Sequence, residues 1–442
     1  MSDASLKGKV PPHHLEAEQA VLGALLLDWD AVTTTLSYLR PDRFYSIQNQ
    51  IIFEAMLSLS SKGQHGDILS ITEELRSTGK LDQVGGVAYI SSLTDTVPTS
   101  ANIEYYAKIV RDRSVRRDLI KTASQIIADS HDETVDSRSI LEEAQKKIFS
   151  LTDLNQTIEI VNVKRLINDT IEVIEGYCKN NNDYTGIPSG YTRLDSMTSG
   201  FQKSELIIIG ARPSMGKTAI ALNMARYMAV EKHIPVGFLS LEMTYQQIGQ
   251  RLLSQESRID GKKFRSGMFQ TNEISKMQEA AGRIYDAPFY IVDTPNMKLL
   301  DLRAMARRMK TLHDVEIIFI DYIGLISSEN VNIPRHEQIA EVSRSLKSLA
   351  RELKIPIVAL SQVKRDSEGR EPNLADLRES GSIEQDADVV MFIHRERVSS
   401  ENNEPIKSKL LLSKQRNGPT GVINLLFLPQ YAKFENITED KF

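Results

Sequence analysis

The stretch GARPSMGKTA, residues 210–219, lies between two segments of different character. The run before it, LIIIG, has the composition of a buried strand, and the run after it, TAIALNMARYMA, has the spacing of a helix. A loop between a strand and a helix directs backbone N–H groups and the positive end of the helix dipole at an anion. We therefore expect this loop to bind the phosphates of a nucleoside triphosphate.

The residue types in the loop suit that chemistry. Gly216 lets the backbone approach a phosphate closely, Lys217 can reach the terminal phosphates, and the Thr218 hydroxyl can ligate Mg²⁺. Ala211 stands where the general pattern has its first glycine, and Pro213 has no N–H to offer, although the residues after it do. The predicted nucleotide-binding residues of the loop are Ser214, Met215, Gly216, Lys217, Thr218 and Ala219.

The second half of the chain, from about residue 186, alternates short apolar runs with helical stretches. Near-continuous apolar strands suit a parallel sheet that is covered by helices on both faces. The later stretch KLLLSKQRNGPTGVINLLF predicts a hairpin that turns at Asn417-Gly418. The predicted parallel strands are LIIIG, VGFLS, FYIVD, EIIFID, IPIVALSQ and DVVMFIH. We expect an α/β domain with a mostly parallel sheet and with ligand sites beyond the carboxyl ends of its strands.

Three polar residues stand at or just past the ends of these strands. Asp321 ends the strand EIIFID and suits a carboxylate that holds Mg²⁺ through water, although a strand-end aspartate can also cap a turn. Glu242 could polarise an attacking water, or it could be an acid at a helix N-terminus. Gln362 ends the strand IVALSQ, where an amide could contact a γ-phosphate.

Lys414 and Arg416 lie two residues apart in KQRNGPTG and would share one face of a strand. They lie too far along the chain to need to serve their own phosphate loop. An arginine supplied by another subunit can raise the rate of phosphoryl transfer roughly 10³–10⁵-fold. The alternative is an exposed hairpin whose positive charges keep its edge soluble.

The segment DLRESGSIEQDADVV, residues 376–390, combines glycine with small polar groups before a strand. Such groups allow close approach to a phosphate chain, so the segment is a candidate for DNA contact. Its chemistry alone is equally that of any polar loop.

The first half of the chain shows helical spacing and no catalytic pattern. In LEAEQAVLGALLLD, five apolar residues recur on one helical face: Ala17, Ala20, Val21, Ala24 and Leu25. A second stripe runs from Val163 to Tyr177, and CKNNNDYTGIPSG then breaks the regularity. This stripe must be buried against its own neighbouring domain or against an adjacent subunit. We predict a helical domain over 1–155, a linker with an amphipathic helix over 156–185, and the α/β domain over 186–442.

Composition narrows the class of protein further. The chain has 442 residues and one cysteine, Cys178, which excludes an intrachain disulfide framework and a cysteine-rich metal site. The polar N-terminus lacks a secretory signal, and no apolar run approaches the roughly 18 residues of a membrane span, so we expect a cytoplasmic protein without a membrane partner. A net charge of −5 argues against a general basic coat for nucleic acid. It allows a local site, because charges more than about 8 Å away are screened at physiological salt.

Taken in order, these stretches resemble the bacterial replicative DNA helicases of the DnaB type, and the resemblance covers nearly the whole chain. PPHHLEAEQAVLGALLLD resembles the N-terminal opening of that family. In the second half, the stretches that resemble its helicase motifs are GARPSMGKTA, LSLEM, IIFIDYIGLI, IPIVALSQ, LRESGSIEQDADVV and KQRNGPTG. The family's loop usually reads RPSMGKT, so Pro213 belongs there and Ala211 is tolerated.

The resemblance implies a RecA-like ATPase that forms a homohexameric ring on single-stranded DNA, moves 5′-to-3′ and uses ATP with Mg²⁺. It implies partners at the replication fork, namely primase and a helicase loader that meet the helical domain, and it makes the amphipathic stripe a linker helix on an adjacent subunit.

The resemblance also implies roles for single residues. Lys217 and Thr218 would bind phosphate and Mg²⁺, Asp321 would hold the metal, and Glu242 would activate water. The other implied assignments are Gln362 for coupling nucleotide state to DNA, Lys414 and Arg416 for the neighbour's γ-phosphate, Arg251 near the nucleotide base, and Arg378, Glu379 and Gly381 for single-stranded DNA.

Two other functions remain open from the sequence. One is another RecA-like ATPase, such as a strand-exchange recombinase, and strand displacement would distinguish it. The other is a replisome scaffold that binds nucleotide only for assembly, and DNA-stimulated phosphate release would exclude it.

Overall fold

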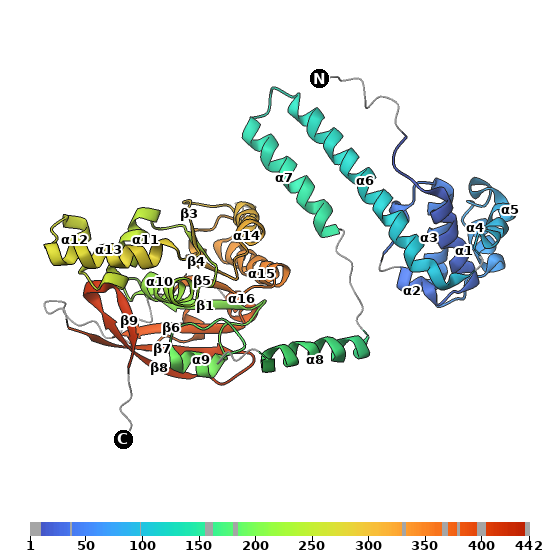
Figure 1. Ribbon diagram of the computed structural model, residues 1–442. Coiled ribbons are helices and arrows are strands. Elements are labelled where there is room, and N and C mark those ends of the chain that lie inside the picture. Colours follow the sequence, from blue (N-terminus) through green and yellow to red (C-terminus); the bar gives the residue numbers. More distant parts are fainter. Residues whose placement is uncertain are drawn as a thin grey trace. The chain divides into compact units, whose positions relative to one another are not determined.

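The protein forms two compact units, Met1–Ile171 and Glu172–Phe442, in a computed structural model (Figure 1). The structure describes residues 10–35, 38–97, 99–154, 162–179, 184–328, 333–364, 370–377, 381–395 and 404–437. The domain boundaries expected after residues 155 and 185 stay predictions. Among the described residues, no helix is both long enough and apolar enough to cross a bilayer.

The first unit is helical, as predicted. Its helices are α1 (Leu15–Leu27), α2 (Ala31–Thr35), α3 (Ile47–Ser61), α4 (Ile68–Ser77), α5 (Gly86–Asp95), α6 (Ile103–Ser130) and α7 (Ser137–Leu154). Helix α1 lies at the centre of the core, and Val21, Leu22 and Leu25 are fully buried there. The Glu18 carboxylate is also buried, and it accepts hydrogen bonds from the backbone of Tyr45 and from the Asn49 amide. Paired in this way, the carboxylate does not oppose folding.

Helix α8 (Val163–Lys179) has the predicted amphipathic stripe. Leu166, Ile167, Ile171 and Ile174 remain between 48% and 53% exposed in the single chain. The side chain of Tyr177 lies outside the described residues. An apolar stripe of this width on an exposed helix is typical of a surface that is buried by a partner.

The second unit is built on one sheet, which has nine strands within the described residues, in the order β3-β2-β4-β5-β1-β6-β7-β8-β9. The first six in this order are parallel, and β7, β8 and β9 continue the sheet in antiparallel fashion. The strands are β1 (Leu206–Ala211), β2 (Val236–Ser240), β3 (Phe289–Asp293), β4 (Ile317–Asp321), β5 (Ile357–Gln362), β6 (Val389–Arg395), β7 (Ile406–Gln415), β8 (Gly421–Leu428) and β9 (Lys433–Asn436). Both the mostly parallel sheet and the hairpin between β7 and β8 are confirmed.

Helices cover both faces of the sheet (Figure 1). The helices of this unit are α9 (Thr192–Thr198), α10 (Lys217–Arg226), α11 (Tyr245–Ser257), α12 (Gly261–Ser266), α13 (Thr271–Tyr285), α14 (Leu299–His313), α15 (Arg335–Leu353) and α16 (Gly381–Asp386). Alternate strand residues enter two separate cores, so that Ile207 packs with α10 and α11 while Ile208 packs with α14 and α15. This two-sided burial is why the strands read as continuous apolar runs.

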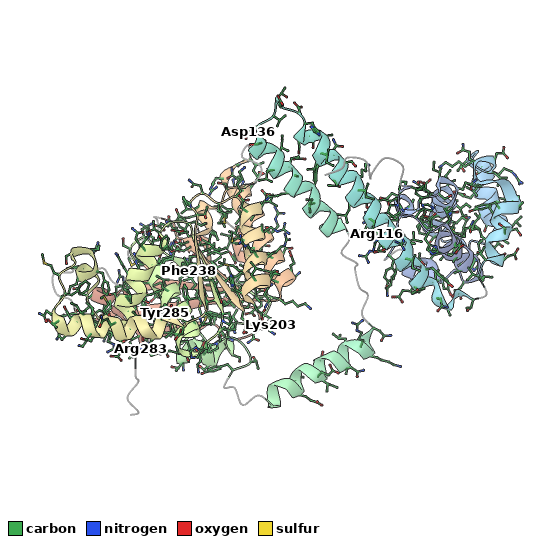
Figure 2. The ribbon with its side chains drawn as sticks, turned by 45° about the horizontal axis from the view of Figure 1, so that its top comes forward. Arg116, Asp136, Lys203, Phe238, Arg283 and Tyr285 are labelled. Carbon is green, nitrogen blue, oxygen red and sulfur yellow. The ribbon has the colours of Figure 1, made fainter. Side chains whose placement is uncertain are left out.

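Aromatic rings fill the core beneath α10 and α11. The ring of Phe238, labelled in Figure 2, stacks between Phe289 at 6.1 Å and Phe319 at 6.0 Å on the neighbouring strands. Helix α10 begins at Lys217 and ends in a π-helical turn, Tyr227–Glu231, whereas the sequence pattern predicted one uninterrupted helix. Ala219, Ile220 and Leu222 of α10 are buried in this core, so the start of the helix is held next to the loop that follows β1.

Candidate nucleotide-binding site

The loop between β1 and α10 has a backbone that only small residues accommodate well. Ser214 and Gly216 have positive φ angles of 66° and 99°. A Cβ on Gly216 would lie 2.9 Å from the ring of Phe434, closer than real Cβ contacts. Gly216 is therefore required both by its backbone conformation and by the aromatic floor beneath the loop.

Lys217 opens α10 with its ammonium nearly buried. The Nζ lies 3.0 Å from Asp321 Oδ1 and 3.9 Å from Glu242 Oε2. The closer contact is an ion pair without hydrogen-bond geometry, so neither Nζ nor Oδ1 has a hydrogen-bond partner among the described residues. Buried polar groups in native proteins are rarely left in this state. The unfilled donors of Lys217 are those that a phosphate would fill.

The predicted metal ligands lie side by side. Thr218 Oγ1 donates a hydrogen bond of 2.6 Å to Asp321 Oδ2, and Asp321 is fully buried at the end of β4. A hydroxyl and a carboxylate are oxygen ligands that Mg²⁺ accepts, and phosphates and waters commonly complete its shell. These two side chains therefore fit a nucleotide-bound Mg²⁺.

The sheet brings Glu242 and Gln362 to the same place. Strands β2 and β4 pair with Ser240 opposite Asp321, so Glu242 follows two residues beyond this register. Gln362 pairs with Ala211 at the end of β1, next to the loop. Both residues line a cavity of about 870 Å³, within the range of ligand pockets. Their positions agree with the sequence analysis, while their roles stay predictions.

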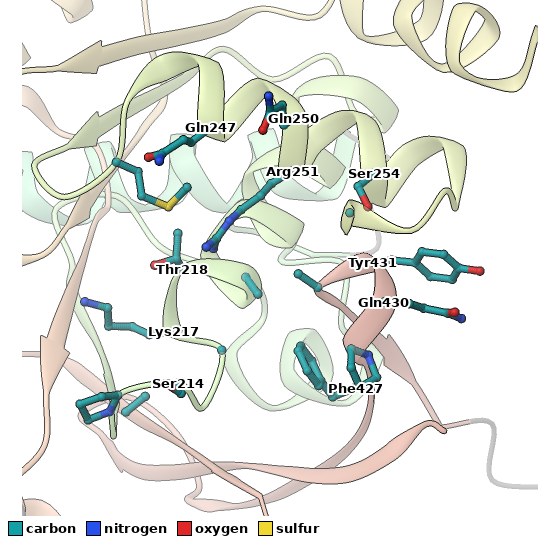
Figure 3. Close-up of a pocket in the computed structure, with 18 of the residues that line it drawn as sticks. Ser214, Lys217, Thr218, Gln247, Gln250, Arg251, Ser254, Phe427, Gln430 and Tyr431 are labelled. Atoms are coloured by element: carbon teal, nitrogen blue, oxygen red, sulfur yellow. The ribbon is translucent and has the colours of Figure 1, made fainter. Parts of the chain in front are cut away.

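Arg251 lines the same cavity. Its guanidinium points from α11 toward Thr218, while Gln430 and Tyr431 lie elsewhere along the cavity wall (Figure 3). Burial lowers the pKa of Arg251, and the carboxylates of Asp321 and Glu242 act in the opposite direction. The guanidinium thus lies on the Thr218 side of the cavity, and the predicted role of Arg251 near a nucleotide base stays a prediction.

The side chain of Met215 lies apart from the cavity, and its predicted part in nucleotide binding stays a prediction. The other five predicted loop residues line the cavity, whereas Met215 is absent from its wall and packs against the apolar core beneath the loop. Its side chain anchors the loop, because an apolar chain in this position gains more from the core than from a polar cavity.

Some residues of the cavity wall were missed by the sequence analysis. Arg395 ends β6, donates a hydrogen bond to the Ser214 carbonyl, and lies 4.2 Å from the ring of Phe427. Gln430 and Tyr431 follow β8. These residues lie about 180 to 220 positions after the phosphate loop, and no local pattern marks them.

Lys414 and Arg416 do not line the cavity of their own chain. Lys414 Nζ donates to the carbonyls of Glu384 at 2.5 Å and Ala387 at 2.8 Å. Arg416 Nη2 donates to the Gln385 carbonyl at 2.6 Å, and Nη1 lies 3.3 Å from Asp388 Oδ1.

Both cations thus reach the C-terminus of α16, where cations are favoured. Burial, followed by the charge of Arg416, lowers the pKa of Lys414.

The candidate DNA segment is only partly described. Arg378 and Glu379 lie outside the described residues, and Gly381 is the first residue of α16. The role of these three residues stays a prediction.

Comparisons with known proteins agree with this architecture. A family model described as the DnaB-like helicase C terminal domain matches residues 186–436, and one described as the DnaB-like helicase N terminal domain matches residues 10–112. The chain is 52% identical to the replicative DNA helicase DnaB of Treponema pallidum, over 97% of each chain. It is 43% identical to that of Geobacillus stearothermophilus, over 97% of this chain and 96% of the relative.

Solved structures give the same result. A structure described as a DnaB-like replicative helicase and its interactions with primase matches with a TM-score of 0.72 and 31% identity, over 96% of this chain and 100% of the other. A second solved structure, described as an ATPase domain, matches with a TM-score of 0.57 and 33% identity, over 63% of this chain and 100% of the other.

Proposed function

Because this chain belongs to the DnaB-like helicase family, we propose that it is an ATP-driven enzyme that separates duplex DNA at the replication fork. The observation that supports this most strongly is the buried Lys217 ammonium, which has no hydrogen-bond partner and lies between two carboxylates. A binding site needs unfilled donors, and a hydrolase also needs a carboxylate that can activate water.

Each of these residues has its own role in the proposed hydrolysis. The loop N–H groups and Lys217 bind the β- and γ-phosphates, and Arg251 adds positive charge at the same end of the cavity. Thr218 and Asp321 would hold Mg²⁺, which neutralises phosphate charge. Glu242, half exposed and 3.9 Å from Lys217, orients the attacking water. Gln362 lies next to the loop and contacts the γ-phosphate side, so that its position depends on nucleotide state.

We further propose that the active assembly is a homohexameric ring, and the position of Arg416 supports this. Arg416 lies at the end of the sheet where β1 begins, because Asp388 bonds both Arg416 and the Leu206 amide. Strand β1 takes five residue steps from Leu206 to Ala211, which corresponds to roughly 17 Å. This distance from the loop of its own chain supports a role for Arg416, with Lys414, at the phosphate site of a second copy.

The DNA segment completes the mechanism. Arg378, Glu379 and Gly381 would contact the backbone of one DNA strand, and the ring would move along it 5′-to-3′. The enzyme would act in the cytoplasm with a helicase loader and with primase, with which the related solved helicase interacts. The exposed apolar residues of α8 support its packing onto an adjacent subunit.

The test is unwinding of forked DNA by the full chain with ATP and Mg²⁺. Wild-type protein should separate a fork that carries a 5′ tail, and Lys217→Ala should not, because the terminal phosphates lose their buried cation. Lys203→Ala is the matched control, since this lysine, labelled in Figure 2, is exposed and absent from the cavity wall. Unwinding by Lys217→Ala hexamers would refute the proposal.

Each rival function predicts a different result. A recombinase would pair strands without displacing the fork. A scaffold would bind ATP without DNA-stimulated release of phosphate.

A further inference from the structure

Tyr322 follows the metal-site residue Asp321 and contacts Lys217 directly. The Lys217 Nζ lies 3.9 Å from the centre of the Tyr322 ring. The ring is half-buried and packs against the same apolar core as Met215, beneath the phosphate loop. The sequence analysis gave Tyr322 no role, although it is the one aromatic ring within contact of this ammonium among the described residues.

The position of the ring is fixed by its surroundings. A Cβ on Gly324 would lie 2.7 Å from Tyr322 Cε2 and 3.2 Å from Cδ2, which is too close for a real side chain. The ring therefore lies directly against the Gly324 backbone. A ring that is held in this way presents a constant π face to the lysine.

The contact suits an ammonium that must stay ordered and keep its donors unfilled. The π face attracts a cation electrostatically and takes up no conventional N–H···O hydrogen bond. The ion pair with Asp321 lacks hydrogen-bond geometry, so the ring and the carboxylate together hold Nζ while its N–H groups remain available. Because the ammonium is already held in place, phosphate binding costs less conformational entropy.

We propose that Tyr322 is a positioning residue that holds the Lys217 ammonium in readiness for nucleotide phosphates, an inference that rests on the proposed function. Tyr322 does not touch the nucleotide itself. Its effect on affinity is transmitted through Lys217, and the ring rather than the hydroxyl carries it. A cation–π contact with a desolvated ammonium corresponds to about a 5- to 30-fold change in an equilibrium constant.

The first measurement is the affinity of the full chain for a fluorescent ADP analogue with Mg²⁺. Tyr322→Phe should bind within about twofold of wild type, and Tyr322→Leu should bind about tenfold more weakly. Tyr285→Leu, an exposed tyrosine of the same unit in Figure 2, is the control and should leave affinity unchanged. Equal losses in Tyr322→Phe and Tyr322→Leu, or no loss in Tyr322→Leu, would overturn the inference.

A double-mutant cycle separates positioning from a general structural effect. In a Lys217→Ala background, Tyr322→Leu should weaken binding by less than about twofold, since the residue through which it acts is gone. A loss as large as in the wild-type background would show that Tyr322 acts on the loop and not on Lys217, and would also overturn the inference.

The Gly324→Ala variant is an independent test, because its result can be interpreted even if the Lys217→Ala variant binds no nucleotide. The added methyl displaces the ring, so affinity should fall, and combining it with Tyr322→Leu should add little. Wild-type affinity in Gly324→Ala would contradict the inference. Failure of the wild-type protein to bind nucleotide would instead refute the proposed function.

Discussion

Cationic side chains lie at both ends of the parallel strands, but they differ in whether their N–H groups have hydrogen-bond partners. At the carboxyl end of the strands, Lys217 is buried beside Asp321 with no hydrogen-bond partner. At the amino end, Lys414 and Arg416 donate hydrogen bonds to the last carbonyls of α16. Lys217 therefore has donors available for a ligand, whereas Lys414 and Arg416 already donate to the backbone of their own chain.

This difference suggests why a site that is shared between copies would not hydrolyse nucleotide in a single copy. In the proposed ring, Lys414 and Arg416 would have to leave α16 to reach a neighbour's phosphate, and each hydrogen bond that they gave up would cost about 1 kcal/mol. Helix α16 lies within the candidate DNA segment, residues 376–390. Release of its C-terminus by the two cations would therefore connect a neighbour's nucleotide to the DNA contact.

The largest effect that would test the comparison is expected from Arg416→Ala. The variant should assemble and bind nucleotide normally, because Arg416 is absent from the cavity wall of its own chain. Its ATP turnover should fall roughly 10³–10⁵-fold, the contribution of an arginine supplied in trans. The measurement is phosphate release in the presence of single-stranded DNA.

Lys409→Ala is the matched control for that variant. Lys409 lies in the same strand β7, but it pairs with Glu371 at the opposite end of the strand. Its loss should leave turnover unchanged. Wild-type turnover in Arg416→Ala would break the comparison, since the amino end would then have no part in hydrolysis.

A smaller effect is expected from Lys347→Met. This substitution removes contacts at the amino end of the parallel strands and leaves the phosphate site unchanged. Lys347 Nζ donates to Asp388 Oδ2 at 2.6 Å and to the Ser204 carbonyl at 2.8 Å. Loss of a hydrogen bond to a buried charge should lower stability by about 1–3 kcal/mol. The melting temperature of the second unit should fall by several degrees, and nucleotide affinity should be retained.

Thermal unfolding monitored with and without ADP and Mg²⁺ checks this outcome. An unchanged melting temperature would show that the ion pair at Asp388 contributes nothing. A loss of nucleotide affinity would show that the two ends of the strands are not independent in the single chain.

Much of the fold could be predicted because it is specified locally. Each parallel strand is a short, mostly apolar run, and Asp321 and Gln362 are the polar residues that end two of them. Parallel strands align their carboxyl ends, so the meeting of Lys217, Thr218 and Asp321 follows from topology once the strands are known.

The rest depends on packing between distant segments. The direction of Arg251, the anchoring of Met215 and the floor that Phe434 provides under Gly216 are decided by tertiary contacts. Lys414 and Arg416 were expected to be exposed or directed at a neighbour, and their bonds to α16 were not foreseen. Sequence spacing places residues on an element, but it does not specify which surface that element meets.

The most direct test of a site shared between copies is to mix two inactive variants. Arg416→Ala retains Glu242, and Glu242→Gln retains Arg416, so mixed rings contain some interfaces with both residues intact. Mixing should raise ATP turnover well above that of either variant alone. If mixed rings form, as judged by co-purification of differently tagged subunits, and turnover stays at the level of the parents, the account is contradicted.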